Sequence, residues 1–412
     1  MGKYTAYNEK VDEYIKKNYL DKIVSSFVDD LGDRLISVIL FGGFGKGEGS
    51  IQSIGGKPVP YNDFDLYIVT EEKLSDEELD EISMNASKEI GMGGLEIAYF
   101  PEEGYDSKKF FHVDVRCIPY DRLNKLMTMQ RYYELKYGSQ VIYGKEDVLD
   151  RMKIINPKDI PISDGLRNLF NKLHQMLLGL KENYNEDQKR IRIFWSYKCY
   201  LSICEVLLIL DDKFVPTAFE KNKLFGKVYR ESFPDLYDKI PDLLEKVQKA
   251  TDFKLKPNFK VDHEELWNQS LRDLLIVFEY YLKKMTGSDN VKGAINEKLP
   301  YTYFKPYLKE KYGFNLWPLQ YGLNLLYFGI LWKKDGFYFN PLLNWKDVGL
   351  RMTLPIYYLL KFKVERDSEN LDKAYDELGK FIKLDEEQKG NFWYLREKSL
   401  KAYGLYYEQR LL

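Results

Sequence analysis

The sequence is poor in cysteine and histidine, with three residues of each among its 412. Three cysteines cannot pair completely, and none has the CxxC spacing of a thiolate zinc site, so we expect no disulfide framework and no structural zinc. The histidines are dispersed along the chain, which excludes a histidine-based zinc set. Free thiols of this kind indicate a reducing, cytoplasmic compartment.

The chain also lacks a net charge of either sign and a long apolar run. Its 62 Lys and Arg residues and 64 Asp and Glu residues leave a formal net charge of −2. Such a balance excludes a global basic field for nucleic acid or an anionic membrane, so any polyanion site must be local. The most apolar run, 319–332, is shorter than the roughly 20 residues that cross a bilayer. We therefore expect a buried helix there and no membrane partner.

What the sequence does contain is a change of pattern along the chain. Apolar residues at spacings of three and four predict a helix over 11–31, and Ser75 followed by Glu78 is the capping-box signature of another helix. Short runs rich in β-branched or alternating apolar residues predict strands at 35–41, 63–69, 95–100 and 110–118. The first 150 residues therefore predict an α+β unit.

Beyond residue 150 the strand pattern fades. Apolar helices are predicted at 166–180, 191–210 and 267–282. The stretch 286–300 collects Thr, Gly, Ser, Asp, Asn and Pro, which favours a linker. We expect three domains, of which the second and third are predominantly α-helical, with the boundaries 1–150, 151–290 and 291–412.

A glycine-rich stretch, FGGFGKGEGS at 41–50, directly follows the first predicted strand. Such a loop can bring backbone N–H groups close to phosphate oxygens. It is neither a Walker A loop, because Lys46 is followed by Gly47, nor a G-x-G-x-x-G loop. Lys46 could neutralise a phosphate or be a solvated loop lysine. Glu48 could brace the loop by accepting backbone N–H bonds or by pairing with Lys46.

Three carboxylates accompany this loop. Asp63 and Asp65 begin a strand whose alternation places its apolar residues on one face and both carboxylates on the other, about 6.5–7 Å apart along the backbone. Carboxylates so placed can converge on divalent cations between them. Asp114 interrupts an otherwise apolar strand, where it would be costly without a cation or hydrogen-bond donors. A glycine loop with three such carboxylates is what two-metal nucleotidyl transfer needs.

The combination of GGFGKGEGS, NDFDLYIV and HVDV resembles the DNA polymerase β-like nucleotidyltransferase superfamily, and the loop is similar to the GGYGRGE-type loop of its uridylyltransferase-like members. The resemblance implies a catalytic core with a mixed sheet, an NTP substrate and Mg²⁺ or Mn²⁺. It implies that Asp63 and Asp65 bind metal and that Asp114 is the third ligand and could be the general base. It also implies that Gly42 and Gly43 lie against the nucleotide phosphates.

The sequence departs from this family at two points. The stretch between the glycine pair and Asp63 carries IQSIGGKPVPY, which we interpret as an insertion. Gly43 stands where serine is frequent in the family, so no hydroxyl contact to phosphate is expected from that position.

Two features of the helical region could take part in chemistry. Lys198 interrupts an apolar helix and is our candidate for a triphosphate contact, although a core helix with ordinary polar edges would have the same pattern. Arg167 and His174 resemble the R-x4-6-H motif of HEPN-type helical nucleases, because seven residues return a helix to nearly the same face.

We therefore expect a metal-dependent nucleotidyltransferase that moves NMP from an NTP to a hydroxyl acceptor and releases pyrophosphate. The acceptor could be a small molecule, a protein or an RNA end, and a homodimer stays open. The alternatives are a metal-independent RNase centred on Arg167 and His174, and a non-catalytic nucleotide- or RNA-binding protein that retains the fold.

Overall fold

The computed structural model describes residues 2–61, 63–91, 113–299 and 348–408. Contacts divide the chain into two compact units, the first comprising 1–164 and 183–263, the second 165–182 and 264–412. The finer division into three domains stays a prediction. Two other predictions, the strand at 95–100 and the buried helix at 319–332, lie outside the described residues.

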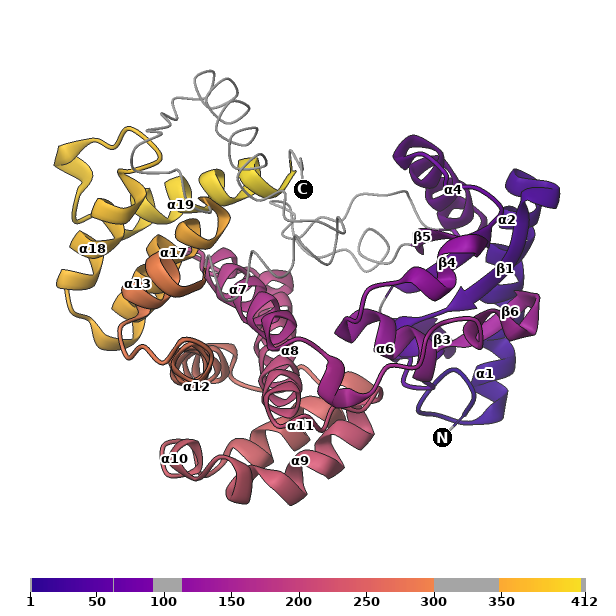
Figure 1. The fold of residues 1–412 in the computed structure, drawn as a ribbon, viewed down its shortest axis with the longest axis horizontal. Coiled ribbons are helices and arrows are strands. Elements are labelled where there is room, and N and C mark those ends of the chain that lie inside the picture. The colour runs from indigo at the N-terminus through magenta and orange to yellow at the C-terminus, as the bar shows by residue number, and fades with distance from the viewer. Residues whose placement is uncertain (1, 62, 92–112, 300–347, 409–412) are drawn as a thin grey trace. The chain divides into compact units, whose positions relative to one another are not determined.

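A four-stranded mixed sheet lies in the first unit (Figure 1). In the order β5-β4-β1-β6, its strands are Val113–Pro119, Phe64–Thr70, Leu35–Leu40 and Gln140–Gly144. β4 runs parallel to β5 and antiparallel to β1, which in turn runs antiparallel to β6. The α+β class, the mixed sheet and the strands predicted at 35–41, 63–69 and 110–118 are confirmed, the last over its described residues.

Helices near the N-terminus pack against this sheet. α1 (Glu9–Ile15) continues through a π-helical segment (Lys16–Leu20) into α2 (Asp21–Leu31), and α4 (Asp76–Glu89) packs on α2 and β5. Ser75 caps α4 in the predicted capping box, because its side chain accepts the N–H of Glu78 while the Glu78 carboxylate accepts the N–H of Ser75.

Side chains of β4 alternate between two buried clusters. Phe64, Leu66 and Ile68 belong to the cluster that includes α2 and α4, whereas Tyr67 and Val69 belong to a second cluster on the other face of the sheet. Because side chains alternate along a strand, Asp65 points to the same face as Tyr67. The strand therefore separates its carboxylate from the main core, as its sequence pattern predicts.

The predicted insertion forms a β-hairpin. β2 (Ile51–Ile54) pairs with β3 (Lys57–Pro60), and the two glycines between them have φ values of 58° and 78°. Positive φ at both central positions is typical of a type I′ hairpin turn, which glycine adopts without strain. The N–H of Tyr61 donates to the carbonyl of Ser50 at 2.9 Å, so the two ends of the hairpin are adjacent. The inserted residues therefore do not move the glycine loop away from the start of β4.

The first unit also contains further helices, whose bounds are α3 (Gly42–Gly45), α6 (Gln130–Tyr137), α8 (Glu186–Leu210), α9 (Ala218–Ser232), α10 (Pro234–Tyr237) and α11 (Leu243–Leu255). α8, α9 and α11 pack against one another (Figure 1). Among the described residues, α8 alone is long and apolar enough to cross a membrane, and 72% of its apolar window is buried inside the protein. It is a core helix of this unit.

The second unit is helical throughout its described residues. Its helices are α7 (Ile162–Leu178) from Gly165 onward, α12 (His263–Thr286) from Glu264 onward, α13 (Val291–Gly293), α17 (Val348–Glu365), α18 (Glu369–Leu378) and α19 (Phe392–Glu408). The linker predicted at 286–300 is wrong for its second half. A π-helical segment follows α13, and Ala294 and Ile295 within it are fully buried, so packing overrides the polar composition.

Candidate functional site

The parallel pairing of β4 with β5 brings the predicted carboxylates together. Asp65 is the register partner of Asp114, so the two residues are direct neighbours across the sheet. Asp63 precedes β4 and lies two residues before Asp65. The Asp114 carboxylate accepts a hydrogen bond from the Arg116 guanidinium at 3.0 Å. Arg116 is a site residue that the sequence did not reveal, although its position two residues after Asp114 places it on the same face.

The pKa of Asp65 reflects the charged groups around it. Burial, followed by the negative charges of Asp63 and Asp114, raises the pKa of Asp65 to about 7, although Arg116 and Lys198 oppose the increase. Oxygen donors of this kind suit Mg²⁺ or Mn²⁺. Among the described residues, no three acidic, histidine or cysteine side chains already form a metal cluster. In its chemistry, a set of three carboxylates fits such a cation.

The glycine loop lies directly against Asp65. Gly42 has a φ of 62°, and a Cβ at this position would lie 2.0 Å from Oδ2 of Asp65. The N–H of Phe41 donates to the carbonyl of Asp65 at 2.9 Å. Within the described residues, the amides of Gly42 and Gly43 donate no hydrogen bond, so both are available to phosphate oxygens. Only glycine at position 42 allows the loop and the carboxylate to approach this closely.

Glu48 fixes the loop to the helices of the same unit. Its fully buried carboxylate accepts the N–H groups of Ala218 and Phe219 at 3.0 and 2.9 Å, which are the first two amides of α9. Lys254 of α11 pairs with it at 2.8 Å. Burial acts to raise the pKa of Glu48, but Lys254 and the two amides outweigh it and lower the pKa to about 2. Glu48 therefore braces the loop through backbone N–H bonds, and its lysine partner is Lys254 rather than Lys46.

Lys46 belongs to a second buried group of charges. Its ammonium lies 3.1 Å from Glu134, whose other oxygen lies 2.6 Å from Lys221. Lys221 is also 2.6 Å from Glu205. Burial lowers the pKa of Lys46, against the attraction of Glu134. The positive charge of Lys46 is thus used to hold the loop against α6, and the phosphate contact predicted for it stays a prediction.

Lys198 differs from the other buried lysines of this unit. It forms no ion pair among the described residues, and its ammonium lies 4.4 Å from the ring centroid of Phe194. Burial lowers the pKa of Lys198, while the nearby charges of Asp63 and Asp65 act to raise it. It is therefore a cation close to the carboxylates whose charge no neighbouring acid neutralises directly.

The two residues of the predicted nuclease motif lie in the second unit. The ring of His174 stacks on Tyr403 with 3.9 Å between centroids. Burial, helped by the charge of Arg396, lowers the pKa of His174 to about 4. The imidazole is therefore neutral near pH 7 and packed against a ring, which is typical of a structural histidine. The surroundings of His174 therefore do not favour the RNase alternative.

No protein family matches the chain, and no curated protein matches it. Among solved structures, the crystal structure of spectinomycin adenyltransferase AAD(9) from Enterococcus faecialis, determined with ATP and spectinomycin, is similar to this chain with a TM-score of 0.35. The two sequences are 17% identical, and the similarity covers 62% of this chain and 97% of that chain.

Proposed function

We propose that this protein is a divalent-metal-dependent nucleotidyltransferase, which moves a nucleoside monophosphate from an NTP to a hydroxyl acceptor and releases pyrophosphate. The placement of Asp65 carries the proposal. Asp65 pairs in register with Asp114, and its carboxylate lies against Gly42 of a loop whose first amides are available. Carboxylates that suit a divalent cation thus lie beside amides that are available to phosphate oxygens, and this arrangement supports the proposal.

The roles of the individual residues follow from their positions. Asp63, Asp65 and Asp114 would hold Mg²⁺ or Mn²⁺, which when bound offsets triphosphate charge and makes the acceptor hydroxyl more acidic. The amides of Gly42 and Gly43 hold phosphate oxygens in place.

Lys198 supplies a positive charge to the triphosphate, since no neighbouring acid pairs with it directly among the described residues. Asp114 would accept the proton of the acceptor hydroxyl. The cytoplasmic compartment and a homodimer stay predictions.

The test compares Asp63→Asn and Asp65→Asn with the wild-type protein. Each α-labelled NTP is incubated with Mg²⁺ or Mn²⁺ and with hydroxyl acceptors of the three predicted classes, and binding of a non-hydrolysable NTP is measured with and without metal. Loss of one carboxylate removes several kcal/mol of charge stabilisation, so we expect transfer to fall by about 1,000-fold. Circular dichroism checks that each variant is folded.

The matched control is Asp121→Asn, because the Asp121 side chain is 65% exposed and lies outside the site. It should transfer NMP at the wild-type rate. Transfer that persists in both Asp63→Asn and Asp65→Asn would refute the metal-dependent mechanism. Metal-dependent NTP binding without any transfer would instead support the non-catalytic alternative.

A further inference from the structure

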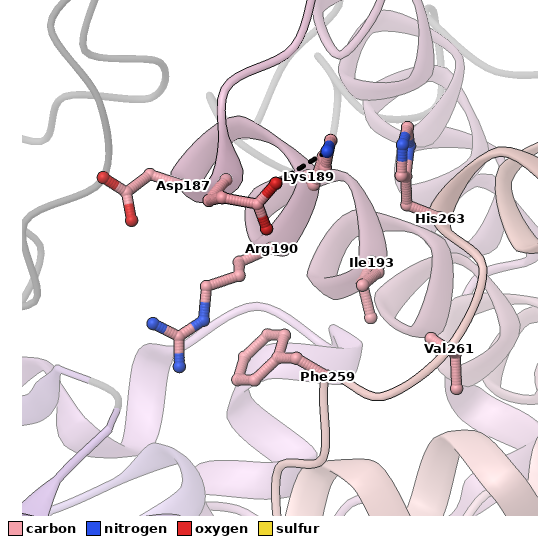
Figure 2. A pocket seen from close by; sticks show the side chains of 8 residues that line it. Asp187, Lys189, Arg190, Ile193, Phe259, Val261 and His263 are labelled. Carbon is pink, nitrogen blue, oxygen red and sulfur yellow. Dashed lines mark hydrogen bonds and ion pairs between the residues drawn. The ribbon is translucent and has the colours of Figure 1, made fainter.

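A pocket opens near the start of α8, within the first unit. Its cavity volume is about 340 Å³, at the lower end of the roughly 300–1,000 Å³ of small-molecule sites. Figure 2 shows Arg190 beside Phe259, with Ile193, Val261 and His263 on the other side of the view. The wall therefore combines an aromatic ring, aliphatic side chains and groups that form hydrogen bonds.

The charges around this pocket cancel. The guanidinium of Arg190 lies 4.7 Å from the ring centroid of Phe259, which holds it by a cation–π contact. Neither Arg190 nor Asp187 forms an ion pair among the described residues, whereas Lys189 pairs with Glu186 at 2.6 Å. The pocket thus offers one cation and one carboxylate to a ligand, beside an ion pair that is already formed.

Packed aromatic rings connect the pocket wall to the segment that precedes the carboxylates. Lys198, Phe194 and Arg190 follow one another at four-residue spacing, so they share one face of α8 over about 12 Å. The ring of Tyr61, two residues before the first carboxylate, lies 5.8 Å from the rings of both Phe194 and Phe259. The pocket thus lies at one end of the face of α8 that carries Lys198 at the other, eight residues away.

We propose that this pocket binds an uncharged, hydroxyl-bearing ring at the far end of a substrate, an inference that rests on the proposed function. A ligand with a net charge of either sign would be attracted to one of Asp187 and Arg190 and repelled by the other, so its charge would gain little affinity. Neutral hydroxyls can instead accept from the guanidinium and donate to the carboxylate in charge-assisted hydrogen bonds. The apolar part of such a ring packs against Phe259.

Two substrates of the proposed reaction could carry such a ring. The ring is either the nucleoside of the NTP or a sugar-like acceptor, since both carry hydroxyls on an uncharged ring. Adenosine represents the first source and methyl α-glucopyranoside the second. Glucosamine and glucose 6-phosphate add a positive or negative charge to the same pyranose ring, so they test the charge argument.

Binding of these four compounds to the full chain is measured by saturation-transfer NMR and calorimetry, without metal or turnover. We expect adenosine or methyl α-glucopyranoside to bind. Phe259→Ala, which removes the ring against which the ligand packs, and Arg190→Gln, which removes a charge-assisted hydrogen bond, should each weaken that binding about tenfold. Tyr143→Ala is the control, since Tyr143 is an aromatic residue that is 40% exposed and lies outside the pocket. Arg190 is exposed, so its variant remains informative if Phe259→Ala does not fold.

The result also distinguishes this proposal from the proposed function. If neither neutral compound binds, if the charged pyranoses bind as tightly, or if both pocket variants bind like the wild type, the pocket proposal is wrong. Because the measurement needs no metal, it stands whether or not the Asp63 and Asp65 variants lose NMP transfer. Adenosine binding alone assigns the pocket to the nucleotide, and glucoside binding alone assigns it to the acceptor.

Discussion

The two units differ in the neighbours of their acidic side chains. In the second unit, Glu377 is 1% exposed and pairs with both Lys292 and Lys380. In the first unit, Glu48 is equally buried and paired, but two residues of the neighbouring strands, Asp65 and Asp114, lie side by side. Buried acids paired with lysines are thus a feature of both units, and acids that repel one another are what marks the candidate site.

The largest expected effect comes from matched substitutions of the two buried glutamates. Glu48→Gln and Glu377→Gln each remove a buried carboxylate from lysine partners that are between 21% and 52% exposed, so each should reduce the free energy of unfolding by about 3 kcal/mol. Glu48→Gln alone should also weaken metal-dependent NTP binding, because Glu48 holds the glycine loop to α9 and α11. Denaturant unfolding and NTP titration at low temperature measure the two effects.

The outcome for NTP binding decides between the two roles. Equal weakening by both variants would mean that general destabilisation, rather than the position of the glycine loop, controls the site. Rescue of binding in Glu48→Asp, relative to Glu48→Gln, would support a carboxylate that positions the loop.

The second prediction concerns the glycine pair. A methyl group at Gly42 would lie 2.0 Å from the Asp65 carboxylate at a φ of 62°, so Gly42→Ala must displace one of them. A displacement of about 1 Å in a catalytic group can cost about 100-fold in rate, and we expect a loss of this size in NMP transfer. Gly226→Ala is the control, since a Cβ at this position of α9 would have no neighbour within 4 Å. Similar rates for the two variants would contradict the contact between loop and carboxylate.

The third prediction tests whether His174 has only a structural role. Its pKa is about 4 in the fold and about 6.5 in an exposed histidine. The unfolded chain therefore binds the additional proton, so this contribution to stability is complete above pH 6.5 and is lost as the pH falls toward 4. The ring is partly exposed, so we expect a loss of about 2 kcal/mol rather than the full value of the shift.

The measurement compares unfolding of the wild type and His174→Phe at pH 7 and pH 4.5. The variant keeps the stacking on Tyr403 but cannot titrate, so its stability should fall less with acid. Unchanged NMP transfer in His174→Phe would show that His174 takes no part in the proposed reaction. Loss of an RNA-cleaving activity in this variant would instead support the nuclease alternative.

Local pattern was enough to predict how the strand of the candidate site presents its side chains. The alternation of DFDLYIV places Asp65 on the face away from Phe64, and the structure confirms this. The resemblance to a known superfamily predicted that the glycine loop and the carboxylates belong to one site. These inferences depend only on neighbours in sequence and on strand geometry.

The partners of buried charges could not be predicted in the same way. Glu48 accepts a hydrogen bond from Ala218, which is 170 residues away in the sequence. Lys46 pairs with Glu134, which is also distant in the sequence. A sequence pattern shows that such a charge needs a partner but not which residue supplies it. The ion pair of Arg116 with Asp114 was missed for another reason, because alternation gives the shared face but not the rotamers that join them.

The hairpin that follows the glycine loop has a practical consequence. Its base is closed by the hydrogen bond between Tyr61 and Ser50, and its tip carries Gly55, Gly56 and the half-exposed Ile54. Exposed turns of this kind accept inserted residues with little effect on the rest of a fold. A cysteine or short epitope placed at the tip would therefore give a site for a fluorescent dye or for surface attachment, with the chain entering and leaving at the same points.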